Sequence, residues 1–215
     1  MLEKMGAFFD ARLDGYDAHM LNEIESARAF YPFTAACLPK ESGCCILDLG
    51  CGTGLELEYY FRLNTSARVT GIDLASGMLE ALRKKFPDKA LTLVQGSYFD
   101  VSFGDGVFEA AVSVESLHHF TQEEKIPLYR KLKQALKPDG YFILTDYFAD
   151  TDAQEGFFRS ELLHLKAEQG IADDEFYHYD TPLTVAHETE ALLRAGFSSV
   201  EVIGKWGATR TLKAK

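Results

Sequence analysis

The segment LDLGCGTGLEL, at residues 47–57, constrains the fold of this 215-residue chain more than any other. A short apolar run at 44–49 leads into three glycines at alternate positions, and residues 54–63 then place apolar side chains at helical spacing. This order predicts a buried strand, a tight loop and a helix. Glycine permits positive φ angles and lets a ligand approach the backbone. The segment is therefore either a ligand-binding loop or only a tight turn.

Predicted strands and helices alternate through most of the chain. Short apolar runs predict five strands, at 44–49, 67–73, 90–96, 108–114 and 140–147. Helical spacing follows at 76–86, 122–136 and 185–197, with Ser76 as the expected cap of the first of these helices. The last residues alternate on both sides of Gly207, which predicts an antiparallel hairpin. The whole pattern predicts one α/β domain over 1–215 with a mostly parallel seven-stranded sheet.

Two segments stand outside this alternation, residues 1–43 and residues 148–184. The first has helical character and is expected to form an N-terminal cap segment. The second is longer than a connection requires, and such long connections are usually functional, so it is expected to form a lid. Both are rich in residues that could contact an acceptor: Tyr16, Asp17, His19, Met20, Phe157, Phe158, Phe176, Tyr177, His178 and Tyr179. Most of these aromatic side chains are expected only to dock the segments onto the core.

Composition excludes several classes of protein. The 33 acidic residues outnumber the 22 basic ones, and a net charge of -11 disfavours binding to nucleic acid. No apolar run approaches the roughly 20 residues of a membrane helix, and the N-terminus lacks the pattern of a secretion signal, so a cytoplasmic location is expected. The crowded cysteines and the spacing of the six histidines fit no common metal motif, and no metal is expected. The oligomeric state stays open, with a homodimer as one alternative.

The spacing of the glycines distinguishes between ligands. The dinucleotide fingerprint GxGxxG has its third glycine where this chain has Leu55, so a nicotinamide oxidoreductase is disfavoured. The spacing is instead DxGxGxG, formed by Asp48, Gly50, Gly52 and Gly54. An acid at the end of the strand is unfavourable beside a pyrophosphate and suits a ligand with a positive charge.

The residues from Ile46 to Tyr147 resemble the class I S-adenosylmethionine-dependent methyltransferases. ILDLGCGTG is similar to the first motif of that family, and VTGIDLASGML, LVQGSYFD, FEAAVSVESLHHF and LKPDGYFILTDY are similar to the segments that follow. The resemblance implies a Rossmann-like three-layer sandwich and S-adenosyl-L-methionine as the cofactor, with S-adenosyl-L-homocysteine as the product. It also implies a set of cofactor-binding residues: Asp48, Gly50, Cys51, Gly52, Gly54, Asp73, Leu74, Met78, Ser97, Tyr98 and Val114. Ser97 stands where many relatives have Asp.

Within this set, the resemblance places Gly50 and Gly52 at the methionine part of the cofactor and Asp73 at the ribose hydroxyls. A carboxylate and two adjacent hydroxyls can form a bidentate, charge-assisted pair. The alternative for Asp73 is the N-cap of the following helix. Tyr16 is added from the N-terminal segment, because an aromatic ring can attract the sulfonium by cation–π interaction.

Candidate catalytic residues are Glu115, His118 and His119, just past the fourth predicted strand; Asp146 and Tyr147 end the fifth. Methyl transfer from a sulfonium is an in-line displacement that depends mainly on positioning. A base is needed only if the acceptor must lose a proton, so a packing or hydrogen-bonding role for the histidines is the alternative. The sequence therefore predicts a methyltransferase for a small-molecule acceptor. A methyltransferase for protein or RNA and a non-catalytic cofactor-binding regulator stay as alternatives.

Overall fold

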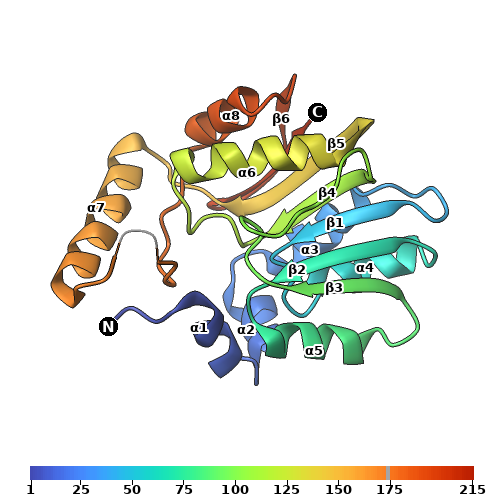
Figure 1. Ribbon diagram of the computed structural model, residues 1–215, viewed down its shortest axis with the longest axis horizontal. Helices are drawn as coiled ribbons and strands as arrows, with labels where there is room; N and C mark the ends of the chain where they lie inside the picture. Colours follow the sequence, from blue (N-terminus) through green and yellow to red (C-terminus); the bar gives the residue numbers. More distant parts are fainter. Residues whose placement is uncertain (173–174) are drawn as a thin grey trace.

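A seven-stranded sheet in the order β3-β2-β1-β4-β5-β7-β6 forms the centre of the computed structural model, which describes residues 1–172 and 175–215 (Figure 1). The strands are β1 (Cys45–Leu49), β2 (Arg68–Asp73), β3 (Ala90–Gln95), β4 (Phe108–Val114), β5 (Leu136–Tyr147), β6 (Val200–Trp206) and β7 (Thr209–Ala214). The first five are parallel, and β7 runs antiparallel to both β5 and β6. The predicted fold class is confirmed, including the terminal hairpin.

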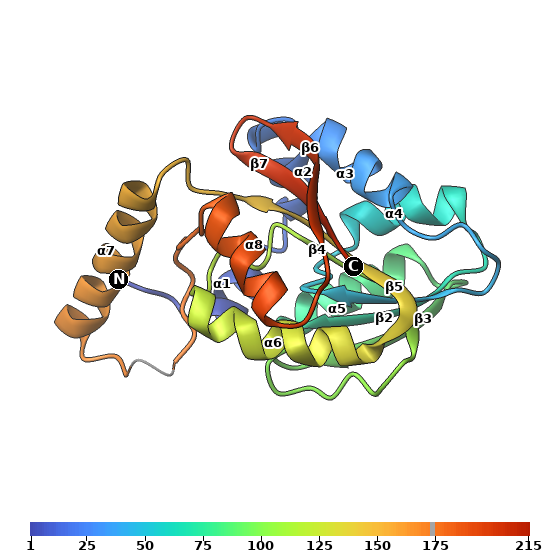
Figure 2. The same cartoon turned by 90° about the horizontal axis from the view of Figure 1, so that it is seen from above.

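Helices cover both faces of this sheet (Figure 2). Those of one face are α3 (Ala27–Ala36), α4 (Leu55–Leu63) and α5 (Ser76–Lys85), and those of the other are α6 (Gln122–Ala135) and α8 (Val185–Arg194). Successive side chains of a strand point to opposite faces. Ile46 accordingly packs into the first helical layer and Leu47 into the second, and both are fully buried. Asp48 therefore points to the same face as Ile46, toward α4.

The N-terminal segment has two parts. Helices α1 (Met5–Ala11) and α2 (Tyr16–Glu23) lie near the carboxyl ends of β1 and β2, whereas α3 packs beside α4 against the sheet (Figures 1 and 2). Asp10 of α1 accepts a hydrogen bond from the backbone N–H of Gly77 at 2.8 Å, at the start of α5. Ala75 is the N-cap residue of α5, so the expectation that Ser76 caps this helix was wrong. The side chain of Asp10, 67 positions before Gly77, instead binds a free backbone N–H group at the start of this helix.

The insertion 148–184 contains one long helix, α7 (Asp152–Gln169), at the periphery of the molecule (Figures 1 and 2). The chain then returns toward the sheet and pairs with the N-terminus. Met5 donates its N–H to the carbonyl of Phe176 at 3.3 Å, and His178 donates its N–H to the carbonyl of Glu3 at 2.9 Å. The two segments outside the βα alternation thus contact each other. Among the helices that the structure describes, none has the length and apolar character needed to cross a bilayer.

Candidate functional site

The glycine loop lies at the carboxyl end of β1, between β2 and β4. Ligands of open α/β sheets bind at this position, where the strand order reverses. Gly50, Gly52 and Gly54 all have positive φ angles, of 71°, 47° and 73°. A Cβ atom at Gly50 would lie 2.0 Å from Ser116 Oγ. Both the backbone conformation and the close approach of the loop after β4 therefore require glycine at position 50.

Asp73, at the end of β2, is bound to this loop. Its Oδ2 accepts a hydrogen bond from the backbone N–H of Gly52 at 2.8 Å, and its Oδ1 accepts one from Ala75 at 2.9 Å. Burial raises the pKa of this carboxyl above its usual value, against the effect of these two hydrogen bonds. Asp73 thus orders the loop and also borders the cleft in front of it.

A cleft of about 50 Å³ lies in front of the loop. Most of the predicted cofactor-binding residues line it: Tyr16, Gly50, Gly52, Asp73, Leu74, Met78, Tyr98 and Val114. Ser116 and Glu115 complete the wall at the end of β4, and Met5 and Phe9 of α1 cover the cleft from the N-terminal side. The cleft is small because α1 and the start of α2 lie over it.

The other four predicted cofactor-binding residues, Asp48, Cys51, Gly54 and Ser97, do not line this cleft. Cys51 is buried in the core, and a Cβ atom at Gly54 would lie 2.4 Å from Leu82 Cδ1. Ser97 accepts a hydrogen bond from the backbone N–H of Phe99 at 3.2 Å, within its own turn. The contact of these residues with a cofactor stays a prediction.

Asp48 meets Glu56 at the first turn of α4. Asp48 and Glu56 are only 1% and 4% exposed, and each carboxyl group affects the pKa of the other. Burial and, after it, the neighbouring Glu56 raise the pKa of Asp48 well above its usual range. Asp48 Oδ2 and Glu56 Oε1 have no hydrogen-bond partner in the described part of the chain.

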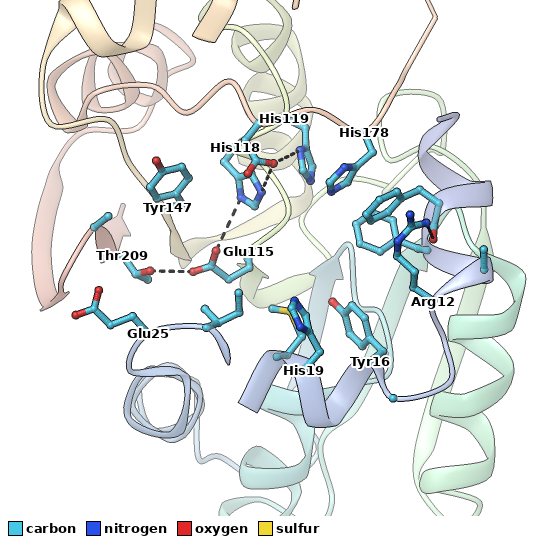
Figure 3. Close-up of a pocket in the computed structure, with 18 of the residues that line it drawn as sticks. Arg12, Tyr16, His19, Glu25, Glu115, His118, His119, Tyr147, His178 and Thr209 are labelled. Carbon is cyan, nitrogen blue, oxygen red and sulfur yellow. Dashed lines mark hydrogen bonds and ion pairs between the residues drawn. The ribbon is translucent and has the colours of Figure 1, made fainter. Parts of the chain in front are cut away.

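A second and larger cavity, of about 840 Å³, lies beside the cleft (Figure 3). Its wall comes from α1 and α2, from the loop after β4, from the insertion near His178 and from the β6–β7 hairpin, which contributes Trp206 and Thr209. Four side chains border both the cavity and the cleft: Phe9, Tyr16, Glu115 and His119. The two spaces therefore share one wall.

Glu115 and His118 follow β4 and reach into this cavity (Figure 3). Glu115 has a positive φ of 48°, a rare conformation for a residue other than glycine. Its Oε1 accepts a hydrogen bond from the hydroxyl of Thr209 at 3.1 Å, and its Oε2 lies 4.0 Å from His118 Nδ1. Burial and then Asp146 raise the pKa of Glu115 to about 8. This carboxyl is therefore mostly protonated at neutral pH.

His118 is held by Asp146 at the end of β5, with 2.5 Å between Nδ1 and Oδ1. Asp146 is 2% exposed and also accepts the backbone N–H groups of Leu117 and Tyr147 at 2.9 and 3.0 Å. Burial opposes the charged imidazolium, but Asp146 and Asp180 outweigh it and raise the pKa of His118 well above its usual range. Burial, reinforced by His118, lowers the pKa of His119.

The structure brings Glu115, His118 and His119 together, as the sequence predicts, but their catalytic roles stay predictions. Sequence reasoning missed Asp180, whose carboxylate lies beside both histidines, and it missed Phe9 and the hairpin residues. Only the acid itself, within HYDTP, could have indicated Asp180. Tyr177 is outside both spaces; its hydroxyl donates to Glu175 at 2.9 Å, and Phe157 is exposed on α7.

Comparison with known proteins identifies the family. The Methyltransferase domain family matches residues 47–144. The chain is 33% identical over 199 residues to the carboxy-S-adenosyl-L-methionine synthase of Wolinella succinogenes, a match that covers 85% of this chain and 80% of that protein. The chain belongs to the class I S-adenosylmethionine-dependent methyltransferases. This methyltransferase is also 34% identical over 101 residues to the fatty-acid O-methyltransferase of Mycolicibacterium smegmatis, over 47% of this chain and only 36% of that protein.

Solved structures share the fold. A putative O-methyltransferase from Nostoc punctiforme PCC 73102 has a TM-score of 0.72 at 19% identity, covering 99% of this chain and 61% of that one. DhpI in complex with SAH also has a TM-score of 0.72, at 18% identity, covering 97% and 93% of the two chains. At such identities the likeness concerns the fold alone.

The cofactor of this methyltransferase is S-adenosylmethionine, and the residues around the cleft fit it. Gly50 offers a cradle that a Cβ atom would fill, and Asp73 brings a carboxylate to the edge of the cleft. Tyr16 brings an aromatic ring to the side shared with the cavity. The cofactor supplies a methyl group on a positively charged sulfur. The chain's own task is to hold an acceptor atom in line with that group.

Proposed function

We propose that this methyltransferase acts on a small-molecule acceptor that binds in the 840 Å³ cavity. The observation that supports this most is the wall shared by cavity and cleft, formed by Phe9, Tyr16, Glu115 and His119. Among the described residues, these four side chains alone would separate an acceptor in the cavity from a methyl group in the cleft. The volume lies within the range of about 300–1,000 Å³ typical of small-molecule sites.

The N-terminal helices α1 and α2 and the insertion 148–184 act together as a lid in this proposal. Backbone hydrogen bonds join them at Met5 and His178, and both contribute to the cavity wall. A closed lid excludes water and orders the acceptor. In the transfer itself, the acceptor atom forms a bond to the methyl carbon while the carbon–sulfur bond breaks and its electron pair stays on sulfur.

The described lining of the cavity contains more acids than Lys or Arg side chains. Arg12 is the only Lys or Arg among the described residues of the lining, and its guanidinium pairs with Glu3 at 2.8 Å. Asp180 and Glu25 contribute acids to the same wall.

Binding and turnover distinguish the alternatives. Calorimetry should show binding of both S-adenosylmethionine and S-adenosylhomocysteine, and Asp73→Ala should weaken both at least tenfold, with Asp88→Ala on the surface after α5 as the control. A screen of metabolite pools should then show products heavier by one methylene. Turnover with bulk RNA or protein instead would overturn the small-molecule proposal. Binding without any turnover would favour a non-catalytic regulator.

A further inference from the structure

Asp180 joins two histidines from a distant part of the chain at the wall of the cavity. Its Oδ1 lies 3.5 Å from His118 Nε2 and 3.3 Å from His119 Nδ1. The three donor atoms all lie within 4.8 Å of one another. Two imidazoles and one carboxylate form a common ligand set for divalent transition metals.

The separations from Asp180 are close to those between two ligands of one ion. His119 Nδ1 also lies 3.2 Å from the carbonyl oxygen of Tyr179, a hydrogen bond that a bound ion would replace. Hydrogen bonds between N–H and oxygen usually measure 2.7–3.2 Å, and both distances to Asp180 are longer. Ligand atoms at about 2.0–2.1 Å from a tetrahedral ion lie about 3.3–3.4 Å apart. The two distances to Asp180 are close to that tetrahedral edge.

The contacts of His118 orient its ring so that Nε2 faces Asp180. Asp146 holds Nδ1 at 2.5 Å, and Asp146 is itself fixed by two backbone N–H groups. A metal-binding histidine usually donates its other ring N–H to a carboxylate in this way. Nε2 is thereby left to bind the ion through its lone pair, on the side that faces Asp180.

A second cluster, of Glu115, His118 and Asp146, is less suited to an ion. Asp146 is almost fully buried and its oxygens are already occupied by Leu117, Tyr147 and His118. The cluster with Asp180 instead borders the cavity, and the carboxyl side chain of Asp180 is 46% exposed. Three protein ligands beside an open space are typical of catalytic rather than structural metal sites.

We propose that His118, His119 and Asp180 bind one divalent transition-metal ion of the zinc or cobalt type at the wall of the acceptor cavity. The open coordination position faces the cavity and binds an oxygen or nitrogen of the acceptor; this second part rests on the proposed function. Binding to the ion lowers the pKa of an acceptor hydroxyl and holds its lone pair in place. The expectation of no metal, made from the sequence, considered the spacing of the cysteines and histidines and did not include Asp180.

The test uses the full chain after treatment with EDTA and removal of the chelator. Titration with Co²⁺, followed by calorimetry and by visible d–d absorption, should show one ion per chain. Asp180→Asn and His119→Gln should each lower the affinity at least tenfold, since even second-shell partners contribute 10–100-fold. Asp14→Asn, at another acid of the cavity wall, is the matched control and should keep the affinity. Circular dichroism checks the fold of each variant.

Three results would overturn the proposal. They are no Co²⁺ or Zn²⁺ binding at millimolar concentration, a loss of less than tenfold in Asp180→Asn, and a thiolate-to-cobalt charge-transfer band, which would assign the ion to the free cysteines. The readout needs neither cofactor nor acceptor. Failure to bind metal would therefore leave the small-molecule proposal standing, and failure to find a small-molecule acceptor would leave the metal site standing.

Discussion

The hydroxyl of Thr53, in the glycine loop, donates a hydrogen bond to the carboxylate of Asp17 on α2. The same carboxylate forms an ion pair with Lys85 at the end of α5, with 2.7 Å between Asp17 Oδ2 and Lys85 Nζ. The side chain of Asp17 therefore connects three parts of the molecule: helix α2, the glycine loop and helix α5. Tyr16, the residue before Asp17, lines both the cleft and the cavity.

Replacement of Asp17 by alanine should weaken S-adenosylmethionine binding about tenfold, because a hydrogen bond to a charged group contributes about 1.5–3 kcal/mol. The free energy of unfolding should fall by about 2–4 kcal/mol, since the hydrogen bond from Thr53 is lost together with a partly exposed ion pair to Lys85 that contributes at most about 1 kcal/mol. Calorimetry and urea unfolding measure the two effects. Glu23→Ala, exposed on the same helix, is the control. Equal cofactor affinity in Asp17→Ala and the control would contradict a role for this contact.

Gly50→Ala should abolish measurable cofactor binding and destabilise the protein by about 1–3 kcal/mol, the usual cost of a strained backbone conformation. The reasons are the φ of 71° and the Cβ that would meet Ser116 Oγ. Gly156→Ala provides the comparison, because Gly156 lies within α7 with open space around it. That substitution should stabilise the helix by up to about 1 kcal/mol. Similar thermal shifts for both variants would show that the loop at Gly50 is less constrained than described.

The buried pair of Asp48 and Glu56 predicts a pH-dependent stability. The raised pKa of Asp48 means that the folded chain keeps a proton that the unfolded chain loses above about pH 4. Stability should therefore fall as pH rises from there toward the folded pKa, by at most about 1.4 kcal/mol per pH unit for one proton. Burial also raises the pKa of Glu56, and the charge of Lys85 only partly opposes this effect.

Glu56→Gln should remove this slope, since an amide can donate to an ionised Asp48 carboxylate. Urea unfolding between pH 5 and pH 9 measures the difference from the wild type. Glu58→Gln, on the same helix, removes only an exposed ion pair with Arg62 and should keep the slope. An identical slope in Glu56→Gln would show that Glu56 does not contribute to the raised pKa of Asp48.

Lys125 and Glu188 form a fully buried ion pair between α6 and α8, at 2.6 Å, and Tyr129 also donates to Glu188. Lys125→Met should destabilise the protein by about 3–5 kcal/mol, because it leaves a buried carboxylate without its cation. The double variant Lys125→Met with Glu188→Leu should recover most of that loss. Thermal and urea unfolding measure both, and additive losses in the double variant would contradict the pairing.

The strands were predictable because their apolar runs are short, local and separated by turn residues. β1, β2 and β4 end at the residues expected within one position, and β5 begins at Leu136 rather than at 140. The cofactor motif was predictable for the same reason, because Asp48, the glycines and Asp73 belong to one continuous βαβ unit. The helix-capping contacts and the contacts around the cavity were not predictable. Asp10, for example, binds the start of α5 although it is 67 positions away from Gly77.

The sequence alone determined the family and the cofactor, since both depend on residues that local strand and helix periodicity places at one sheet edge. Only the tertiary structure decided which residues share the acceptor cavity. Asp180 lies 61 positions after His119, and Thr209 lies 94 positions after Glu115, so no local pattern relates them. Their meeting depends on how the insertion and the antiparallel hairpin return to the carboxyl ends of β4 and β5, and that return is set by long-range packing.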